Sequence, residues 1–145
     1  MARPWADRPS LVAAFLTLVG LGIAGYLTYV HYEGIAPVCS TGGCERVQAS
    51  SYAEIAGVPV SLLGLIGYAG IGASLWLRGD AGRALTFLLA LIGFGFSAYL
   101  TYLELFVIDA ICQWCVASAV VMTALLITAT IRLLRPAAPD RPAPA

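Results

Sequence analysis

Four cysteines in two pairs are the residues of this sequence best suited to chemistry. Two residues separate Cys112 from Cys115, and four separate Cys39 from Cys44. A CxxC pair at the start of a helix can close a small disulfide ring, and the helix N-terminus favours the thiolate that performs exchange. We interpret Asp109 as the N-cap of that helix. The two pairs therefore predict thiol–disulfide chemistry.

Three interpretations of these cysteines are open. Gly42 and Gly43 make the loop between Cys39 and Cys44 flexible, which suits a shuttle whose thiolate must reach two partners in turn. Inert structural disulfides are the second interpretation. A closed zinc site with four thiolate ligands is the third, but the spacing does not match the usual zinc motifs, so we expect no metal.

The elements that carry the cysteines are predicted by four apolar stretches. The 145 residues are 60% hydrophobic and 11% charged, which is more apolar than a typical soluble domain. Each stretch has roughly 20 residues, the length at which a helix spans a bilayer, and lipid offers the backbone no hydrogen bonds. We predict an all-α integral membrane protein with a four-transmembrane-helix bundle, its helices near residues 11–30, 58–77, 84–107 and 111–134.

The arginines predict the orientation of this bundle. Seven of the eight fall on one side of the four predicted helices, and Arg46 falls on the other. Because positive residues are retained in the cytoplasm, both termini should be cytoplasmic. All four cysteines should then lie at the extracytoplasmic face, where disulfides persist. The arginines are scattered and form no basic run, so no nucleic-acid partner is expected.

The chain is expected to form one membrane domain with short flanking segments. Residues 1–10 are the cytoplasmic N-terminus, residues 11–135 the membrane domain, and residues 136–145, with four prolines, a disordered cytoplasmic tail. Residues 45–55 mix polar and apolar side chains, which predicts a short half-helix on the extracytoplasmic membrane surface. Pro59 suits the first turn of the second helix.

The last electron acceptor should dissolve in lipid, because Cys115 is expected about one turn inside the fourth helix. A quinone accepts two electrons, the number that a dithiol supplies. Phe87, Phe94 and Phe96 could line a quinone pocket, and contact with lipid is the other interpretation. Glu104, near the same interface, is expected to snorkel or cap, with a proton source for the quinol as the alternative.

The sequence resembles the vitamin K epoxide reductase family, in its bacterial branch, over nearly the whole chain. Beyond the two cysteine pairs, the resemblance rests on three stretches: CERV leading to a serine at residues 44–50, GVPVSLLG at residues 57–64, and YLTYLE at residues 99–104. It implies a four-helix bundle around a quinone, with the surface half-helix as its lid. The bacterial members are similar in role to DsbB, which implies a bacterial inner membrane location.

The same resemblance implies a route for electrons. A DsbA-like thioredoxin-fold protein would exchange with Cys39 and Cys44, and Cys44 would pass electrons to Cys112. Cys115 would face the quinone, of menaquinone, ubiquinone or vitamin K type. Ser50 matches a family serine that assists near the quinone, whereas its residue type alone favours capping of the surface helix.

Two departures from the vertebrate members bear on the substrate. Val60 aligns with an asparagine and Ala119 with a tyrosine that are associated with vitamin K recognition and epoxide chemistry. Their absence favours plain quinone reduction over epoxide reduction. A non-enzymatic tetraspan protein with structural disulfides is the remaining alternative. We expect the quinone to contact the following residues: Cys115, Ser50, Val60, Phe87, Phe94 and Ala119.

Overall fold

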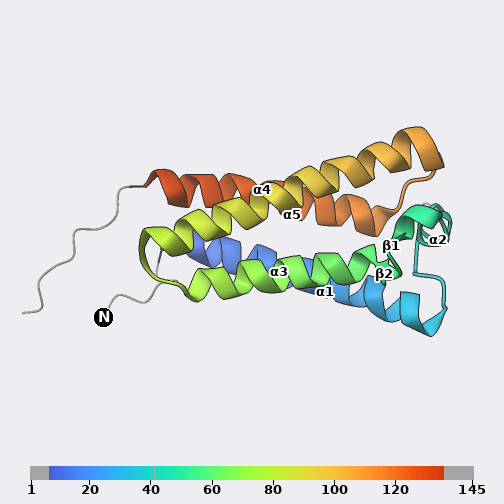
Figure 1. Ribbon diagram of the computed structural model, residues 1–145, viewed down its shortest axis with the longest axis horizontal. Helices are drawn as coiled ribbons and strands as arrows, with labels where there is room; N and C mark the ends of the chain where they lie inside the picture. Colours follow the sequence, from blue (N-terminus) through green and yellow to red (C-terminus); the bar gives the residue numbers. More distant parts are fainter. Residues whose placement is uncertain (1–6, 41, 136–145) are drawn as a thin grey trace, which may run out of the picture.

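The computed structural model describes residues 7–40 and 42–135. Its four long helices are α1 (Arg8–Glu33), α3 (Val60–Trp76), α4 (Gly79–Leu103) and α5 (Gln113–Leu134). Both α1 and α4 pack against α3 and α5, so the helices close into a ring around a shared interior (Figure 1). This confirms the predicted four-helix bundle. The predicted disordered tail and residues 1–6 lie outside the described part of the chain.

The outer surface of the bundle is suited to lipid. Three of its helices are long and apolar enough to cross a membrane: α1, α4 with its continuation to Ile108, and α5; α3 is a shorter apolar helix of 17 residues. Large apolar side chains face outward from them, with Phe15 and Trp76 each 66% exposed. In water such a surface would be strongly unfavourable, whereas lipid solvates it. The chain is therefore a multi-pass membrane protein.

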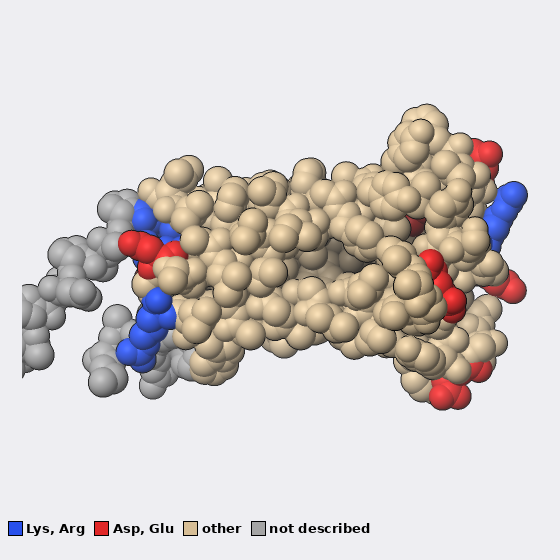
Figure 2. Space-filling model, in the orientation of Figure 1, with Lys and Arg blue, Asp and Glu red and all other residues tan. Residues whose placement is uncertain are grey.

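Charged side chains gather at the two ends of the bundle, and the middle of the face shown in Figure 2 carries none. Five of the described arginines belong to the end at which α1 begins, α3 meets α4, and α5 finishes: Arg8, Arg78, Arg83, Arg132 and Arg135. Arg46 belongs to α2, at the end that carries the cysteines. The described chain thus has the charge asymmetry on which the predicted orientation depends.

Small side chains on one face of α1 allow the helices to approach closely. Ala13, Thr17, Gly20 and Ala24 recur every three or four residues and are buried. Such spacing of small residues is typical of helix contacts in membranes. Tyr68 of α3 is 1% exposed and lies against Gly20, where a Cβ atom would overlap its ring. Gly20 therefore makes room for the largest fully buried side chain of the bundle.

We expect Gly20→Ala to lower the stability of the bundle. The added methyl group overlaps the Tyr68 ring, and such overpacking typically costs about 1–3 kcal/mol. Thermal unfolding in detergent, followed by tryptophan fluorescence, should show a melting temperature lower by several degrees. Gly22→Ala is the matched control because nothing lies within 4 Å of a Cβ at that position. Equal melting temperatures for the two variants would contradict this account of the packing.

The cysteine-bearing end is built from short elements, and here the predicted surface helix over residues 45–55 is only partly correct. Helix α2 (Cys44–Gln48) has 5 residues and is followed by the 3-10 turn η1 (Ser51–Ala53). The strands β1 (Glu54–Ile55) and β2 (Val58–Pro59) then pair antiparallel. Ala56 (φ 53°) and Gly57 (φ 81°) both adopt positive φ, as a two-residue hairpin turn requires. Because Glu54 and Ile55 pair as a strand next to this turn, the helical segment ends at Ala53 and does not reach Ile55.

The connection from α4 to α5 also differs from expectation. After Leu103 the helix widens into a π-helical turn, η2 (Glu104–Ile108), which ends at Asp109 in the left-handed region (φ 54°). The N-cap of α5 is Cys112, in an extended conformation, so Asp109 is not the helix cap that we predicted. Pro59 is the N-cap of α3, within one residue of its predicted place. These turns determine where the cysteines and Glu104 meet.

Candidate active site

The loop that carries Cys39 is held against the start of α5. The Val38 carbonyl accepts a hydrogen bond from the Trp114 indole N–H (2.7 Å), and the Val38 N–H donates one to the Tyr26 hydroxyl (2.9 Å). The Tyr26 and Trp114 rings pack with their centroids 4.9 Å apart. Side chains of α1 and α5 therefore hold the loop by hydrogen bonds at Val38, one residue before Cys39.

A second set of contacts lies on the other side of Cys39. The side-chain carbonyl of Gln113 accepts hydrogen bonds from the Ser40 hydroxyl (2.7 Å) and the Ser40 N–H (3.2 Å). Gln113 is the residue between Cys112 and Trp114, so the CxxC segment itself binds the loop. A typical hydrogen bond contributes about 0.5–1.5 kcal/mol net, so the two bonds from Ser40 stabilise the contact between the loop and α5 but can still break.

Gly43 permits close contact between the loop and the segment before α5. A Cβ atom at Gly43 would lie 2.8 Å from the Ile111 nitrogen and would also overlap the Ile111 carbonyl oxygen. Both neighbours are backbone atoms, which cannot move aside as a flexible side chain can. We expected the Gly42-Gly43 step to supply mobility. The structure gives Gly43 another role, because only glycine fits at this approach.

The four cysteines come together in one cluster at this end of the bundle. Cys39 and Cys44 form a disulfide, whereas Cys112 and Cys115 are free thiols. Cys44 and Cys112 are fully buried in the same apolar cluster, and Cys39 and Cys115 pack against it. Cys39 and Cys44, which we call the loop pair, are therefore oxidised, and Cys112 and Cys115, which we call the membrane pair, are reduced. Cys44 and Cys112 lie at the centre of the site.

The surroundings of Cys112 favour its thiolate. The Cys115 thiol donates a hydrogen bond to the Cys112 sulfur, and the backbone N–H groups of Trp114 and Cys115 add to it. Together these donors lower the pKa of Cys112 below its usual range, although burial and the nearby Glu104 carboxylate oppose them. The predicted effect of the helix N-terminus is present, and the second thiol of the pair is the larger cause. Cys112 is thus suited to thiol–disulfide exchange.

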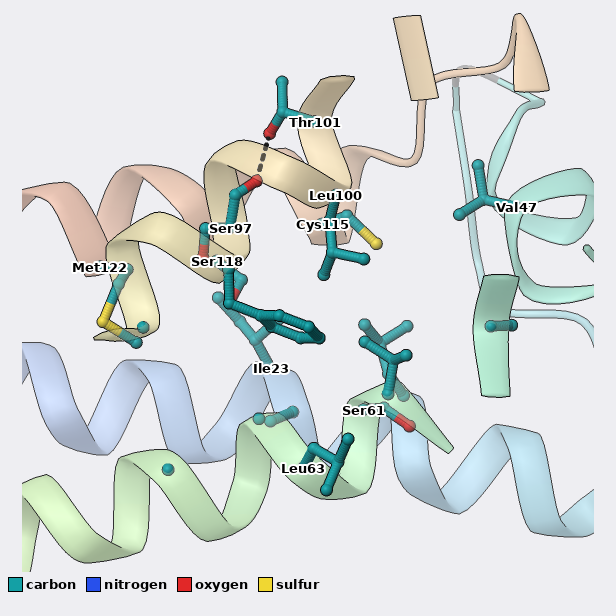
Figure 3. Close-up of a pocket in the computed structure, with 18 of the residues that line it drawn as sticks. Ile23, Val47, Ser61, Leu63, Ser97, Leu100, Thr101, Cys115, Ser118 and Met122 are labelled. Atoms are coloured by element: carbon teal, nitrogen blue, oxygen red, sulfur yellow. Dashed lines mark hydrogen bonds between the residues drawn. The ribbon is translucent and has the colours of Figure 1, made fainter. Parts of the chain in front are cut away.

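A cavity of about 340 Å³ lies between the four long helices at the cysteine-bearing end. Its walls are mostly apolar side chains of all four helices, and residues of α2 and η1 cover one end. Figure 3 shows the Cys115 sulfur directed from α5 toward the side that Val47 closes. The volume lies in the usual range for small-molecule sites. The membrane pair therefore presents one sulfur to an apolar chamber.

The chamber suits a quinone ring in volume and polarity. An apolar wall with a few polar groups is typical of sites for lipid-soluble ligands. Among the lining residues, Ser61 has a buried hydroxyl oxygen that finds no hydrogen-bond partner in the part of the chain that the structure describes. It lies in the first turn of α3, where no preceding helical carbonyl is available to accept its proton. A ligand carbonyl is one group that could satisfy such a hydroxyl.

The predicted quinone contacts divide into two groups. Cys115, Ser50 and Val60 line the cavity, together with Phe96. The Ser50 hydroxyl donates a hydrogen bond to the Val47 carbonyl (2.7 Å) and so closes the turn after α2. Ser50 also borders the cavity.

The other predicted contacts, Phe87, Phe94 and Ala119, are not part of the cavity lining. Phe94 packs instead against the hydrophobic core of the bundle. The helical period explains the result for the two phenylalanines, because Leu89, Ile92, Gly93 and Phe96 present the opposite face of α4 to the cavity.

Sequence reasoning missed several residues of this site. Tyr68 lines the cavity and donates a hydrogen bond to the Ser118 carbonyl (3.0 Å), which joins α3 to α5. Ser61 and Ser118 also line it. A polar residue in the middle of an apolar stretch was the available signal. Within residues 7–40 and 42–135, no group of three or more His, Cys, Asp or Glu side chains is placed to hold a metal ion.

A disulfide and a dithiol stacked above an apolar chamber define a membrane thiol oxidoreductase with a lipid-soluble acceptor. The chain belongs to the vitamin K epoxide reductase family, whose family model matches residues 11–130. Members of this family are quinone-dependent thiol oxidoreductases. The match covers α3, α4 and both cysteine pairs in full, and most of α1 and α5.

Proposed function

We propose that this protein reoxidises a DsbA-like thioredoxin-fold protein and passes the electrons to a membrane quinone. The reaction supports disulfide formation outside the cytoplasm of a bacterial cell. The observation that carries the proposal is the graded burial of the four cysteines. Cys39 is partly exposed, Cys44 and Cys112 are fully buried, and Cys115 borders the cavity. That order leads from a protein partner to a lipid-soluble acceptor.

The first step is exchange with the partner at Cys39. A thiolate of the partner attacks the Cys39 sulfur, and Cys44 leaves as a thiolate. The partner's second thiol then attacks the mixed disulfide and frees Cys39, which leaves an oxidised partner and a reduced loop pair. Attack at Cys39 is favoured over Cys44, because access governs the rate of exchange and Cys44 has no exposed surface.

The second step moves two electrons inward. The Cys44 thiolate attacks Cys112 of an oxidised membrane pair and expels Cys115. Cys39 then attacks Cys44, which restores the loop disulfide and leaves Cys112 and Cys115 reduced. This is the redox state that the structure holds, with the Cys39–Cys44 bond formed and the other two thiols free. The common burial of Cys44 and Cys112 supports this order.

The third step returns the membrane pair to a disulfide. A quinone serves as the acceptor of two electrons and two protons, and Cys115 is the sulfur that borders its chamber. The chain's own contribution is to exclude water with α2 and η1 and to hold Cys115 against the apolar wall. Val60 gives that wall a hydrocarbon surface at the position where vertebrate members have an asparagine. This supports plain quinone reduction rather than epoxide chemistry.

The proposed membrane orientation follows from charge. Five described arginines belong to the end opposite the cysteines, which favours that end as cytoplasmic. Both termini would then be cytoplasmic, and the cysteine cluster would face the oxidising side of the membrane. A thioredoxin-fold partner on that side would meet the exposed loop around Cys39.

Purified protein in lipid nanodiscs tests the proposed activity directly. With a reduced DsbA-like protein and a quinone, we expect the quinone absorbance to bleach with one disulfide formed per quinone reduced. A partner that lacks its second active-site cysteine should become trapped in a mixed disulfide. Because Cys44 is fully buried, peptide mapping should find this bond at Cys39. Absence of bleaching would refute the activity, and trapping at Cys44 would refute the proposed order of exchange.

A further inference from the structure

Glu104 has an unusual place beside the membrane pair. It is 4% exposed and is the buried carboxylate among the residues that the structure describes. Its Oε2 atom accepts a hydrogen bond from the Cys112 N–H (3.2 Å), and its side chain competes with the Cys112 sulfur for the single proton of the Cys115 thiol. One acid thus contacts both residues of the CxxC pair, including a reacting sulfur.

The backbone is distorted where Glu104 lies. Glu104 begins the π-helical turn η2 (Glu104–Ile108), and its carbonyl accepts a hydrogen bond from Ala110 N–H (3.2 Å). π-Helical turns inserted in α-helices frequently occur at functional sites. Here the widened turn lets the chain fold back, so that Cys112 reaches the side chain of a residue eight positions earlier.

Glu104 also separates two spaces of different polarity. It lines the apolar cavity, and it lines an open pocket at the rim of the bundle, which we call the rim pocket. The rim pocket is bordered by the exposed side chains of Arg46 and Asp109. Arg46 forms no salt bridge with Glu104 within residues 7–40 and 42–135. A buried carboxylate without a cationic partner is costly, so protonation and deprotonation are both accessible to it.

We propose that Glu104 is a catalytic proton carrier between the Cys115 thiol and the cavity. As Cys115 gives up its electrons, its proton passes to the carboxylate, and the resulting acid donates that proton into the chamber. The second proton comes from water through the rim pocket, because Cys112 reacts as a thiolate. Two sulfurs thereby lose two electrons and form one disulfide, while the acceptor gains two electrons and two protons. This inference rests on the proposed function and deepens it.

Other titratable groups near Glu104 must be considered when the pH dependence of the reaction is used to test its role. Cys112 and Cys115 face it from α5, and the phenols of Tyr52 and Tyr68 share the cavity with it. The charged groups of the rim pocket are exposed and therefore screened by solvent. Glu104 is thus the carboxyl group whose loss should change the pH dependence of the quinone step.

Glu104→Gln is the decisive variant. Glutamine keeps the shape and an oxygen acceptor for the Cys112 N–H, but it cannot carry a proton. We expect quinone reduction to slow about 100-fold or more, which is typical for loss of a general acid–base. The wild-type rate should fall as acid protonates Glu104 and, separately, the Cys112 thiolate. The variant should lose the part of this fall that belongs to Glu104 and keep the part that belongs to Cys112. Glu104→Asp should restore part of the rate, and Glu33→Gln, at an exposed acid near the same end, should match wild type.

The outcomes separate this inference from the proposed function. Reduction of the Cys39–Cys44 disulfide by the partner should keep its wild-type rate in Glu104→Gln, which also shows that the variant folds. A slower quinone step with an unchanged pH profile would make Glu104 structural and overturn the proposal. Wild-type protein that bleaches no quinone would instead refute the proposed function.

A measurement on unaltered protein covers the case in which the variant does not fold. Time-resolved infrared spectra of wild-type protein during a single turnover with quinone should show the C=O band of a buried carboxylic acid appear and then decay. Among the described residues Glu104 is the buried carboxyl that can give this band. Its absence would overturn the proposal, since a carrier must change its protonation during the reaction.

Discussion

Cys115→Ala is expected to abolish quinone reduction, with a loss of roughly a thousandfold or more, because no other cysteine borders the cavity. The loop pair lies on the other side of the buried cluster, so the fraction of the variant that keeps the Cys39–Cys44 disulfide should still exchange once with the partner. The check is quinone bleaching driven by reduced partner, beside a gel assay of the loop disulfide. Retained bleaching would show that electrons leave from another sulfur.

The same variant should also reveal the path between the pairs. With Cys115 absent, the Cys112 thiolate can attack the loop disulfide but cannot re-form its own bond. The bond that accumulates should join Cys44 to Cys112, since these two are the fully buried members of the cluster. Mass mapping identifies it. A bond from Cys39 to Cys112 would reverse the proposed order, and Cys112→Ala is the control in which neither bond can form.

The sequence was sufficient for the architecture because the membrane imposes simple requirements. A helix that spans lipid needs a run of roughly 20 apolar residues, and such runs can be read directly. The cysteine pairs were equally visible, since their spacing carries their chemistry. The charge asymmetry between the two ends of the bundle could be predicted because the arginines can be assigned to one side or the other once the four helices are placed.

The interior of the bundle was harder to predict because hydrophobic patterning weakens in a membrane. Lipid and core are both apolar, so Phe94 and Phe96 look alike in the sequence. Phe96 lines the cavity, whereas Phe94 packs against the core. Gly20 gave no sign that it faces Tyr68, because that contact joins two different helices. Such pairings depend on the rotation of each helix about its axis, which a nearly uniform apolar stretch does not encode.

Short turns were the other limit. The predicted surface helix was too long because the Ala56-Gly57 hairpin turn follows it closely, and one of its positive φ angles belongs to an alanine. The sequence predicts a helix cap at Asp109 because Asp commonly fills that position. It instead adopts the left-handed conformation that ends the π-helical turn, so the chain reaches Cys112 three residues later. Local propensity alone does not predict a π-helical turn.

Gly43→Ala is expected to uncouple the two cysteine pairs while leaving each of them intact. The new methyl group would overlap the Ile111 backbone, so the loop must move away from the segment that precedes Cys112. A displacement of about 1 Å can slow a reaction about 100-fold when its atoms must meet in one geometry. Partner-driven quinone reduction should therefore fall by that factor.

The two cysteine pairs can be reduced independently, which allows a test of whether Gly43→Ala affects only the transfer between them. A small dithiol such as dithiothreitol can attack the partly exposed sulfur of Cys115 without the loop, so quinone bleaching driven by dithiothreitol should stay near the wild-type rate. Gly95→Ala, where a Cβ meets nothing within 4 Å, controls for the effect of any added methyl group. Equal losses with both reductants would mean that the cavity itself is disturbed. Unchanged partner-driven activity would mean that the loop reaches Cys112 without the close approach at Gly43, and transfer would then require a mobile loop.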